Sequence, residues 1–450
     1  MTTTLSTTRM APVAPGSFLL GSAVDLRRDM LGACERAFHT YGDVVRFRIG
    51  PPGLRRELWL ASHPDAAHRV LAGNWTNYRK DNIFYSEIHG AFGDGLLTSQ
   101  DDVWQRQKRF LQPLFTPRRV AGYATTMGEQ VDRLVARWRS RPEGTVDLHD
   151  EMTGLTLRVV CRILFGDDVD QALSVVQRAF GPLGEEVRRR GMAPVRAPMS
   201  WPTGGNRRLL RAQRALYDVC NEIIAGRRAG GDRTGEADLI GLLLDARDSG
   251  SALTAAEVRD QVLIFLLAGH ETTSTALTYT LHLLGRHPEV QDRVREEVDA
   301  AGGDTATLAY TTMVLKEAMR LYPSAPLMGR RAVESDEISG YHIPAGSDVI
   351  IAPWVTHRHP EFWERPERFD PDRFTPEREK TRHRYAWFPF GGGPRSCIGQ
   401  HFSMLESTVA LAALICDFAF TAPPGEPPYT NHITLRPTSG VPSMVRPRRR

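Results

Sequence analysis

The chain has 450 residues, of which 41% are hydrophobic and 24% are charged, without a repeat or a low-complexity segment. These values indicate an ordered globular protein with a large core, and they exclude a disordered or fibrous chain. The formal net charge of +4 argues against nucleic acid as the main partner.

The ends of the chain look like tails. Residues 1–26 are rich in Thr and Pro, contain no apolar run near the roughly 20 residues that span a bilayer, and lack the pattern of a signal peptide. We expect a mobile tail at 1–14, one domain at 15–444, a solvated basic tail at 445–450, and no membrane association.

The first legible elements form a β-hairpin. Val45, Phe47 and Ile49 alternate with arginines, and the run ELWLAS follows after a turn-rich PPGLRR. Beyond it, apolar spacings of three and four predict helices, for example over 127–140, 207–228 and 407–418. Strand patterns return at 341–354 and 432–437, so the predicted fold class is mainly α with small β regions.

Residues 82–99, NIFYSEIHGAFGDGLLTS, have the composition of a loop but are apolar. Loops are normally polar and exposed, so Ile83, Phe84, Phe92 and Leu96 need a surface to cover. Two interpretations stay open, a loop packed on its own core and a lid over an apolar site.

The longest predicted helix begins with a capping box of Thr254 and Glu257 and stops before Pro288. At 1.5 Å per residue it extends roughly 45 to 50 Å, and its apolar middle predicts burial. Within it lies LAGHETTS, residues 267–274. Buried polar groups need partners, and the glycine predicts close approach of a neighbour. Ala268 and Thr272 share a face. The alternative is a Ser/Thr-rich bend with bonds to its own carbonyls.

Two further patterns follow. Glu317 and Arg320 are three apart on a predicted helix, a spacing that allows an ion pair, and Arg368 and Arg373 are candidates for a third member. The loop FPFGGGPRSCIG, residues 388–399, then places Cys397 among four glycines and two prolines, although a packing cysteine normally lies in an apolar helix or strand.

Together these motifs resemble the cytochrome P-450 family of haem-thiolate monooxygenases, in its soluble bacterial form. The pattern F-x-x-G-x-R-x-C-x-G is matched by Phe390, Gly393, Arg395, Cys397 and Gly399. AGHETT matches [AG]-G-x-[DE]-T-[TS], and E-x-x-R and PDRF stand in the family's order. The resemblance covers nearly all of residues 15–440 and implies a long central helix over a buried haem.

The resemblance implies that the Cys397 thiolate is the axial ligand of haem b, iron protoporphyrin IX. A glycine-rich loop, including Gly391, supplies backbone N–H groups and close approach to a flat macrocycle, and the thiolate favours O–O cleavage. By resemblance, the further cofactor contacts are Arg395, Trp104, Lys108 with Arg109 as its rival, and Arg331 with Arg330 as its rival.

The resemblance also assigns roles along the long helix. Ala268 and Gly269 leave room for the co-substrate O2, and Thr272 with Glu271 delivers protons, while His270 is expected to pack. Glu317, Arg320 and Arg373 form a structural network behind the cysteine loop.

Substrate contacts are expected at hydrophobic positions, which implies a lipophilic substrate held by shape. The sequence resembles members of secondary metabolism that hydroxylate or epoxidise terpenoid or other natural-product skeletons. The candidate substrate residues are Ile83, Phe84, Phe92, Leu96, Leu267, Ala325, Leu327, Met328 and Ile433.

The sequence contains no flavin or iron–sulfur segment, so the resemblance implies electrons from a ferredoxin and an NAD(P)H-dependent ferredoxin reductase. A basic cluster is a candidate dock for an acidic ferredoxin, and it comprises Arg106, Lys108, Arg109, Arg118 and Arg119.

The enzyme is expected to be a monomer in the cytoplasm, where cysteines stay reduced. The five cysteines are widely spaced and form no C-x-x-C pair, which argues against a disulfide framework or a zinc site. A peroxide-driven peroxygenase and a non-catalytic haem sensor are the alternatives.

Overall fold

The computed structural model describes residues 9–141, 143–166, 169–191, 193, 196–229, 239–248, 250–431 and 433–448. Its chain forms two compact units, each made of several segments. Unit 1 contains Met1–Tyr85, Ala325–Arg368 and Pro376–Cys397, and unit 2 contains Ser86–Ser324, Phe369–Thr375 and Ile398–Arg450.

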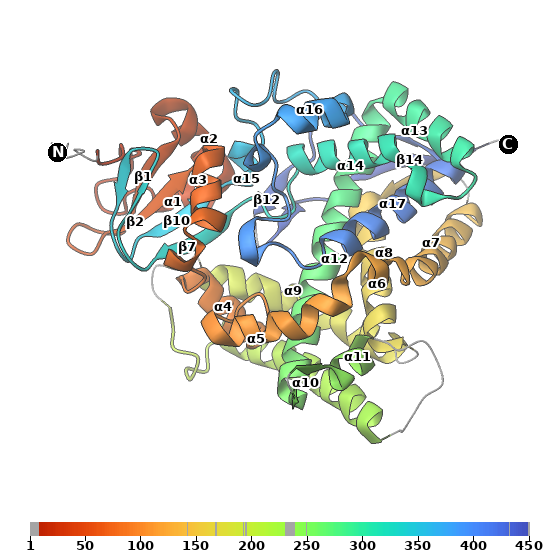
Figure 1. Cartoon of the computed structure of the whole chain (residues 1–450), viewed down its shortest axis with the longest axis horizontal. Coiled ribbons are helices and arrows are strands. Elements are labelled where there is room, and N and C mark those ends of the chain that lie inside the picture. Colours follow the sequence, from red (N-terminus) through yellow and green to blue (C-terminus); the bar gives the residue numbers. More distant parts are fainter. Residues whose placement is uncertain are drawn as a thin grey trace. The chain divides into compact units, whose positions relative to one another are not determined.

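Unit 1 is built on a five-stranded sheet of order β1-β2-β10-β7-β3 (Figure 1). The β2–β10 pair is parallel and the other pairs are antiparallel. Its core includes Trp59, Val349 and Ile351 from the strands and Val70 and Leu71 from the segment after α3. The strands of unit 1 are β1 (Val44–Ile49), β2 (Arg56–Ala61), β3 (Tyr78–Arg79), β7 (Met328–Ala332), β8 (Asp336–Ile338), β9 (Tyr341–Ile343) and β10 (Asp348–Ile351), and its helices are α1 (Ala23–Arg28), α2 (Met30–Tyr41), α3 (Pro64–His68), α15 (Pro353–Thr356) and α16 (Pro376–Thr381).

The predicted hairpin is confirmed as β1 and β2, but its alternation is not. Arg46, expected to face solvent, is 9% exposed. It lies between Glu57, with which it pairs at 3.2 Å, and the ring of Trp59. The segment preceding α1 covers this strand, since Ala14 donates to the Arg46 carbonyl at 2.8 Å and Arg46 donates to that of Pro12 at 2.8 Å.

This segment also corrects part of the expected N-terminal tail. Arg9 bonds to β9 through the amide of His342 at 3.0 Å, and Ala11 is buried. Residues 9–14 are therefore attached to the sheet, because their backbone groups find partners at the edges of β1 and β9. Residues 1–8 of the expected tail lie outside the described residues.

Unit 2 is mainly helical, with small sheets of order β11-β14-β4, β12-β13 and β5-β6. Helix α4 (Ile83–Phe92) begins in unit 1 and continues into unit 2. The other helices of unit 2 are α5 (Asp101–Leu111), α6 (Pro117–Ala121), α7 (Ala124–Arg139), α8 (Leu148–Phe165), α9 (Val169–Gly191), α10 (Gly204–Ala229), α11 (Leu239–Asp245), α12 (Ala255–Arg286), α13 (Pro288–Ala301), α14 (Ala309–Leu321) and α17 (Gln400–Asp417), and its strands are β4 (Gly144–Asp147), β5 (Arg247–Asp248), β6 (Ser251–Ala252), β11 (Phe418–Thr421), β12 (Tyr429–Asn431), β13 (Leu435–Pro437) and β14 (Pro442–Pro447).

Helix α12 confirms the predicted long helix (Figure 1). Thr254 accepts from the Glu257 amide at 3.2 Å and its own amide donates to the Glu257 carboxylate at 2.8 Å, so the capping box is complete. The helix has 32 residues, about 48 Å at 1.5 Å per residue. It ends at Arg286 because Pro288 opens α13.

The loop expected over 82–99 is wrong for its first half, which is α4. The Asn82 side chain accepts from the Tyr85 amide at 3.1 Å and starts the helix. Ile88, Ala91 and Phe92 are buried at the i, i+3, i+4 spacing of one helical face. The apolar character of this stretch therefore reflects an amphipathic helix.

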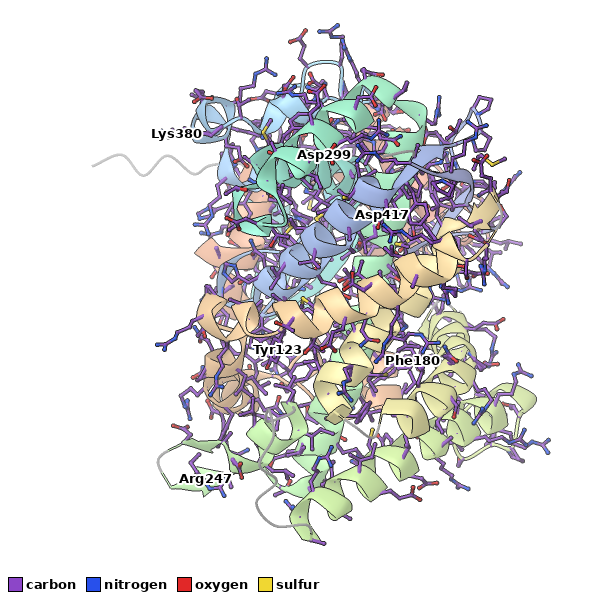
Figure 2. The ribbon with its side chains drawn as sticks, turned by 90° about the vertical axis from the view of Figure 1, so that its right-hand side faces the viewer. Tyr123, Phe180, Arg247, Asp299, Lys380 and Asp417 are labelled. Carbon is purple, nitrogen blue, oxygen red and sulfur yellow. The ribbon has the colours of Figure 1, made fainter. Side chains whose placement is uncertain are left out.

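The first half of the expected basic tail at 445–450, residues 445–447, is a strand. Residues through Pro447 belong to β14, which pairs with β11 and β4. Arg448 then binds the Asp299 carboxylate at 3.0 and 2.8 Å. Figure 2 labels this Asp299. Its carboxylate thus holds the basic end in place, and residues 449 and 450 lie outside the described residues. In the described part of the chain, every helix is too short or too polar to span a bilayer.

Candidate active site

The cysteine loop of unit 1 holds Cys397 in a backbone ring. The Cys397 amide donates to the Phe390 carbonyl at 2.8 Å, and the Gly391 amide donates to that of Phe388 at 2.9 Å. Gly391 and Gly393 have φ of +72° and +65°, which favour glycine. A Cβ on Gly393 would lie 1.9 Å from the Leu71 oxygen, so this loop needs glycine to approach the neighbouring backbone.

Cys397 differs from the other thiols in its exposure. Cys34, Cys161 and Cys220 are buried, whereas Cys397 is exposed. Burial raises the pKa of Cys34 and of Cys220 to about 12, which keeps both as inert neutral thiols. The loop therefore presents the sulfur of Cys397 instead of packing it.

The Lys80 ammonium lies within electrostatic range of that sulfur, and two arginines lie within range of the same ammonium. Burial lowers the pKa of Lys80 well below its usual value, Arg330 and Arg395 lower it further, and Cys397 opposes them. Lys80 and Arg330 are 9% and 5% exposed. Placing several buried positive charges close together costs free energy unless an anion offsets their charge. These cations and the Cys397 sulfur therefore suit a ligand such as haem, which has carboxylates for the cations and an iron atom that a thiolate can bind.

The structure separates the two rival arginines of β7. Arg331 points to Asp348 of β10, with bonds of 3.0 and 3.1 Å. Arg330 is its neighbour on the opposite face of the strand, together with Met328, whose sulfur lies 3.7 Å from the position of a Cβ on Gly391. Arg330 therefore faces the cysteine loop, while Arg331 stabilises the sheet.

One turn of α12 in unit 2 is open although the helix is otherwise buried. Ala268 is exposed and Thr272 is half-buried, while residues 261–267 and 273–284 are buried. The Thr272 hydroxyl donates to the Ala268 carbonyl at 2.6 Å. The back-bond considered as the alternative is therefore present, and it holds the hydroxyl oxygen at the open turn, where its lone pairs can still accept.

Two of the three residues between them, Gly269 and His270, belong to the packed side. A Cβ on Gly269 would lie 2.9 Å from a methyl group of Val160 in α8, so this glycine permits close helix packing, as its pattern predicts. The His270 ring packs on Phe180 at 4.9 Å, and burial lowers its pKa to about 4. His270 is therefore a neutral packing residue at physiological pH, as expected.

Glu271 has two partners that the sequence did not reveal. Arg436 of β13 forms an ion pair with one carboxylate oxygen, and Thr434 donates to the other at 3.0 Å. Neither residue belongs to a recognised motif, and their separation from Glu271 by more than 160 residues leaves no local signal in the sequence.

Helix α5 carries the other expected cofactor contacts. Trp104 is buried, and the Lys108 ammonium lies 5.2 Å from its ring centre. Arg109 instead pairs with Asp248 at 2.9 Å, and Arg106 pairs with Glu257. These carboxylates offset part of the expected basic cluster, in which Arg118 and Arg119 are exposed.

The structural network is assembled in unit 2. Arg320 donates to the Glu317 carboxylate at 2.7 and 2.8 Å, and both side chains are 0% exposed. Arg373 lies 3.4 Å from the Glu317 carboxylate, and the Asp370 amide donates to that same carboxylate at 2.9 Å. The E-x-x-R pair is therefore buried, and Arg373 is the third member.

The expected substrate residues have different degrees of burial. Phe92 is fully buried against Phe180 at 5.5 Å between ring centres, and Leu267 is also buried. These two serve the core of unit 2. The half-buried members are Ile83, Phe84, Leu96, Ala325, Leu327, Met328 and Ile433.

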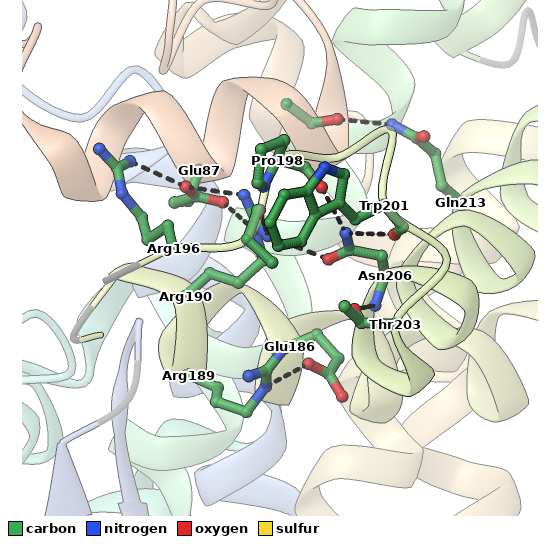
Figure 3. Close-up of polar contacts among 12 residues, drawn as sticks. Glu87, Glu186, Arg189, Arg190, Arg196, Pro198, Trp201, Thr203, Asn206 and Gln213 are labelled. Atoms are coloured by element: carbon green, nitrogen blue, oxygen red, sulfur yellow. Dashed lines mark hydrogen bonds and ion pairs between the residues drawn. The ribbon is translucent and has the colours of Figure 1, made fainter. Parts of the chain in front are cut away.

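A buried ion pair joins α4 to the end of α9 (Figure 3). Arg190 donates to Glu87 at 2.7 Å and to Asn206 at 3.0 Å, and Arg196 reaches the same carboxylate at 3.0 Å. Asn206 donates to the carbonyl of Trp201 at 2.9 Å. The end of α9, the segment before α10 and α4 are thus fastened at one carboxylate.

Comparison with known proteins identifies the family. The Cytochrome P-450 family model matches residues 12–442, so the chain belongs to the cytochrome P-450 family. Members of this family are haem-thiolate enzymes that use O2, and the protein is a cytochrome P-450 monooxygenase.

Several relatives are similar over nearly the whole chain. Cyclooctatin synthase of Streptomyces melanosporofaciens is 37% identical, with 89% of this chain and 88% of the relative covered. Pentalenene oxygenase of Streptomyces avermitilis is 32% identical, with 93% of each covered. Among solved structures, the cytochrome P450DA heme domain has a TM-score of 0.87 at 29% identity, with 98% of each chain covered. The expected fold is thus confirmed.

Proposed function

We propose that this protein hydroxylates or epoxidises a terpenoid or other natural-product skeleton. The observation that carries this proposal is the exposed Cys397 sulfur in a glycine loop, on a chain of this family. Support for the substrate class comes from relatives named cyclooctat-9-en-7-ol 5-monooxygenase and pentalenene oxygenase. The half-buried apolar candidates, Ile83, Phe84, Leu96, Leu327 and Ile433 among them, suit a lipophilic skeleton.

In this proposal the Cys397 thiolate, Arg330, Arg395 and Lys80 hold haem b, and the family resemblance adds Trp104 and Lys108 as propionate contacts. When bound, the haem supplies reductive activation of O2. The cationic group neutralises the carboxylates of the ligand, and the glycines let the loop approach its plane.

The protein's own catalytic groups move protons. Hydroxylation consumes O2, two electrons and two protons for each substrate R–H, and yields R–OH and water. Thr272 holds a proton donor at the open turn of α12, and Glu271 resupplies it. Without that supply, the same two electrons and two protons reduce O2 to hydrogen peroxide and the substrate is left unchanged.

The electrons would come from a ferredoxin and an NAD(P)H-dependent ferredoxin reductase. The exposed Arg118 and Arg119 are the members of the basic cluster best placed to meet an acidic partner. All five cysteines are free thiols, which suits a reducing cytoplasm. We retain the proposals of one haem domain over residues 15–444 and of a monomer.

Arg330 should contribute more to haem retention than Arg331. Arg330→Leu removes a buried cation of the group around Lys80, whereas Arg331→Leu removes only a partly exposed pair with Asp348. We expect Arg330→Leu to lose haem on dialysis and Arg331→Leu to retain it, as measured by the pyridine haemochromogen assay. Equal retention in the two variants would contradict this assignment.

The function is tested by spectral titration and reconstituted turnover. Purified holoenzyme is titrated with a panel of cyclic terpene hydrocarbons and alcohols, and compounds that shift the Soret band are incubated with a surrogate ferredoxin, its reductase, NADPH and O2. We expect a product heavier by one oxygen atom that carries ¹⁸O from ¹⁸O2. Product formed from hydrogen peroxide alone would indicate a peroxygenase, and spectral binding without product from any compound would indicate a sensor.

A further inference from the structure

The hairpin of β12 and β13 is fastened to the turn of α12 that carries Glu271 and Thr272. The Leu435 amide donates to the Ser324 carbonyl at 2.9 Å, and the Leu435 carbonyl accepts from Thr275 at 3.0 Å. The Ser324 hydroxyl in turn donates to the Thr272 carbonyl at 2.7 Å. All these residues belong to unit 2, so the hairpin is attached to α12 directly at Thr275 and, through Ser324, at Thr272.

The same hairpin engages both oxygens of the Glu271 carboxylate. Thr434 donates to one oxygen at 3.0 Å, and Arg436 pairs with the other. Thr434 lies in the bend before β13 and Arg436 lies in β13 itself, and both side chains meet at the Glu271 carboxylate. The orientation of Glu271 is therefore set by a segment remote in sequence.

The surroundings make this ion pair strong. Glu271 is 6% exposed and Thr434 is 4% exposed. Burial lowers the pKa of Arg436, and the charge of Arg436 contributes to the low pKa of both His149 and His270. A charge in such surroundings is costly without its partner, so Glu271 and Arg436 hold one another in place.

The pair also limits what Glu271 can do. An ionised carboxylate only accepts hydrogen bonds, and here Thr434 and Arg436 already bind one oxygen each. Each oxygen keeps a second acceptor site, but a proton taken up there removes the negative charge that pairs with Arg436, so proton transfer by Glu271 disturbs this ion pair. The residue next to Thr434 is Ile433, one of the candidate substrate contacts. A substrate that displaces the hairpin at Ile433 would therefore act first on the bonds of Thr434 and Arg436 to Glu271.

We propose that Arg436 is a positioning residue for Glu271, and that the β12–β13 hairpin links substrate binding to proton delivery through Arg436 and Thr434. This inference rests on the proposed function, in which Glu271 supplies protons. Arg436 itself touches neither the substrate nor the reacting atoms in this scheme.

The test compares Arg436→Gln, Arg436→Lys, Glu271→Gln and the double variant Arg436→Gln/Glu271→Gln as holoenzymes. Thr275→Val is the matched control, because it removes another attachment of the hairpin without touching Glu271. With pentalenene, or the compound of the panel that shifts the Soret band most, hydrogen peroxide and product are measured per NADPH. Deuterium uptake of the peptide containing Leu435, and the unfolding midpoint, are measured without turnover.

We expect Arg436→Gln to raise the ratio of peroxide to product about tenfold, within the range that a positioned proton donor contributes. Arg436→Lys should restore part of the coupling, and the double variant should be no worse than Glu271→Gln alone, since both changes act on one pair. The shifts in unfolding midpoint should be non-additive for the same reason. Thr275→Val should increase deuterium uptake while leaving the peroxide ratio unchanged.

Two results would overturn the inference. If Glu271→Gln leaks peroxide while Arg436→Gln does not, or if their effects add, Arg436 does not position Glu271 and the proposed function stands. If Glu271→Gln stays fully coupled, the proton role of Glu271 fails, and the inference fails with it.

Discussion

Replacing Glu317 with glutamine should lower the unfolding midpoint of the holoenzyme by about 3 to 5 °C. Arg320 would keep its charge at 0% exposure without the carboxylate that now binds it at 2.7 and 2.8 Å. Removing one partner of a buried ion pair costs about 3 to 5 kcal/mol, which is a large fraction of the net free energy of unfolding of a protein. Burial raises the pKa of Glu317, and the hydrogen bond and charge of Arg320 oppose that rise.

Asp292→Asn is the matched control for this prediction. Asp292 and Arg295 also form an i, i+3 ion pair on a helix of unit 2, but the Asp292 side chain is 61% exposed. Such a pair contributes about 1 kcal/mol or less, so the midpoint should change little. Differential scanning fluorimetry on both variants would decide, and a Glu317→Gln midpoint equal to that of Asp292→Asn would contradict the structural role of the network.

Thr272→Ala should divert most electrons from product to hydrogen peroxide. The variant loses the hydroxyl at the open turn of α12, where Thr272 donates to the Ala268 carbonyl at 2.6 Å. A positioned proton donor contributes about 10² to 10⁴ in rate, so product per NADPH should fall at least about tenfold. NADPH, product and peroxide are measured in the same reaction.

Thr280→Ala separates this chemistry from the structural effect of the back-bond. Thr280 makes the same bond to the Ala276 carbonyl at 2.7 Å, two turns further along α12 in a buried position. Its loss should lower the unfolding midpoint and leave coupling intact. Full coupling in Thr272→Ala, or equal uncoupling in both variants, would show that Thr272 has only a structural role.

The elements that the sequence predicted well are those with local causes. The capping box at Thr254 and the proline at 288 define α12 by short-range chemistry, and both act as expected. The β1–β2 hairpin is likewise present, although coverage by residues 9–14 buries Arg46. Helix α4 was missed because glycines and a short length made it resemble a loop, while its apolar spacing of three and four already indicated a helix.

In the candidate site, too, features with a local cause in the sequence were predictable, and features that depend on tertiary contacts were not. The spacing of the cysteine loop was enough to predict that Cys397 is presented and not packed. Which of two adjacent arginines faces the loop depends on the register of β7 against β10, which fixes Arg331 opposite Asp348. The attachment of Arg436 to Glu271 arises only when the chain folds, since tertiary pairing of charges leaves no periodic signal.

The most direct test of the central claim is the absorption spectrum of the dithionite-reduced protein under carbon monoxide, measured for the wild type and for Cys397→Ser. Thiolate ligation by Cys397 predicts a strongly red-shifted Soret band in the wild type and its loss in the variant, with Cys416→Ser as a control that keeps the band. A spectrum of the histidine type, unchanged by Cys397→Ser, would contradict the assignment of Cys397 as the haem ligand and the monooxygenase mechanism built on it.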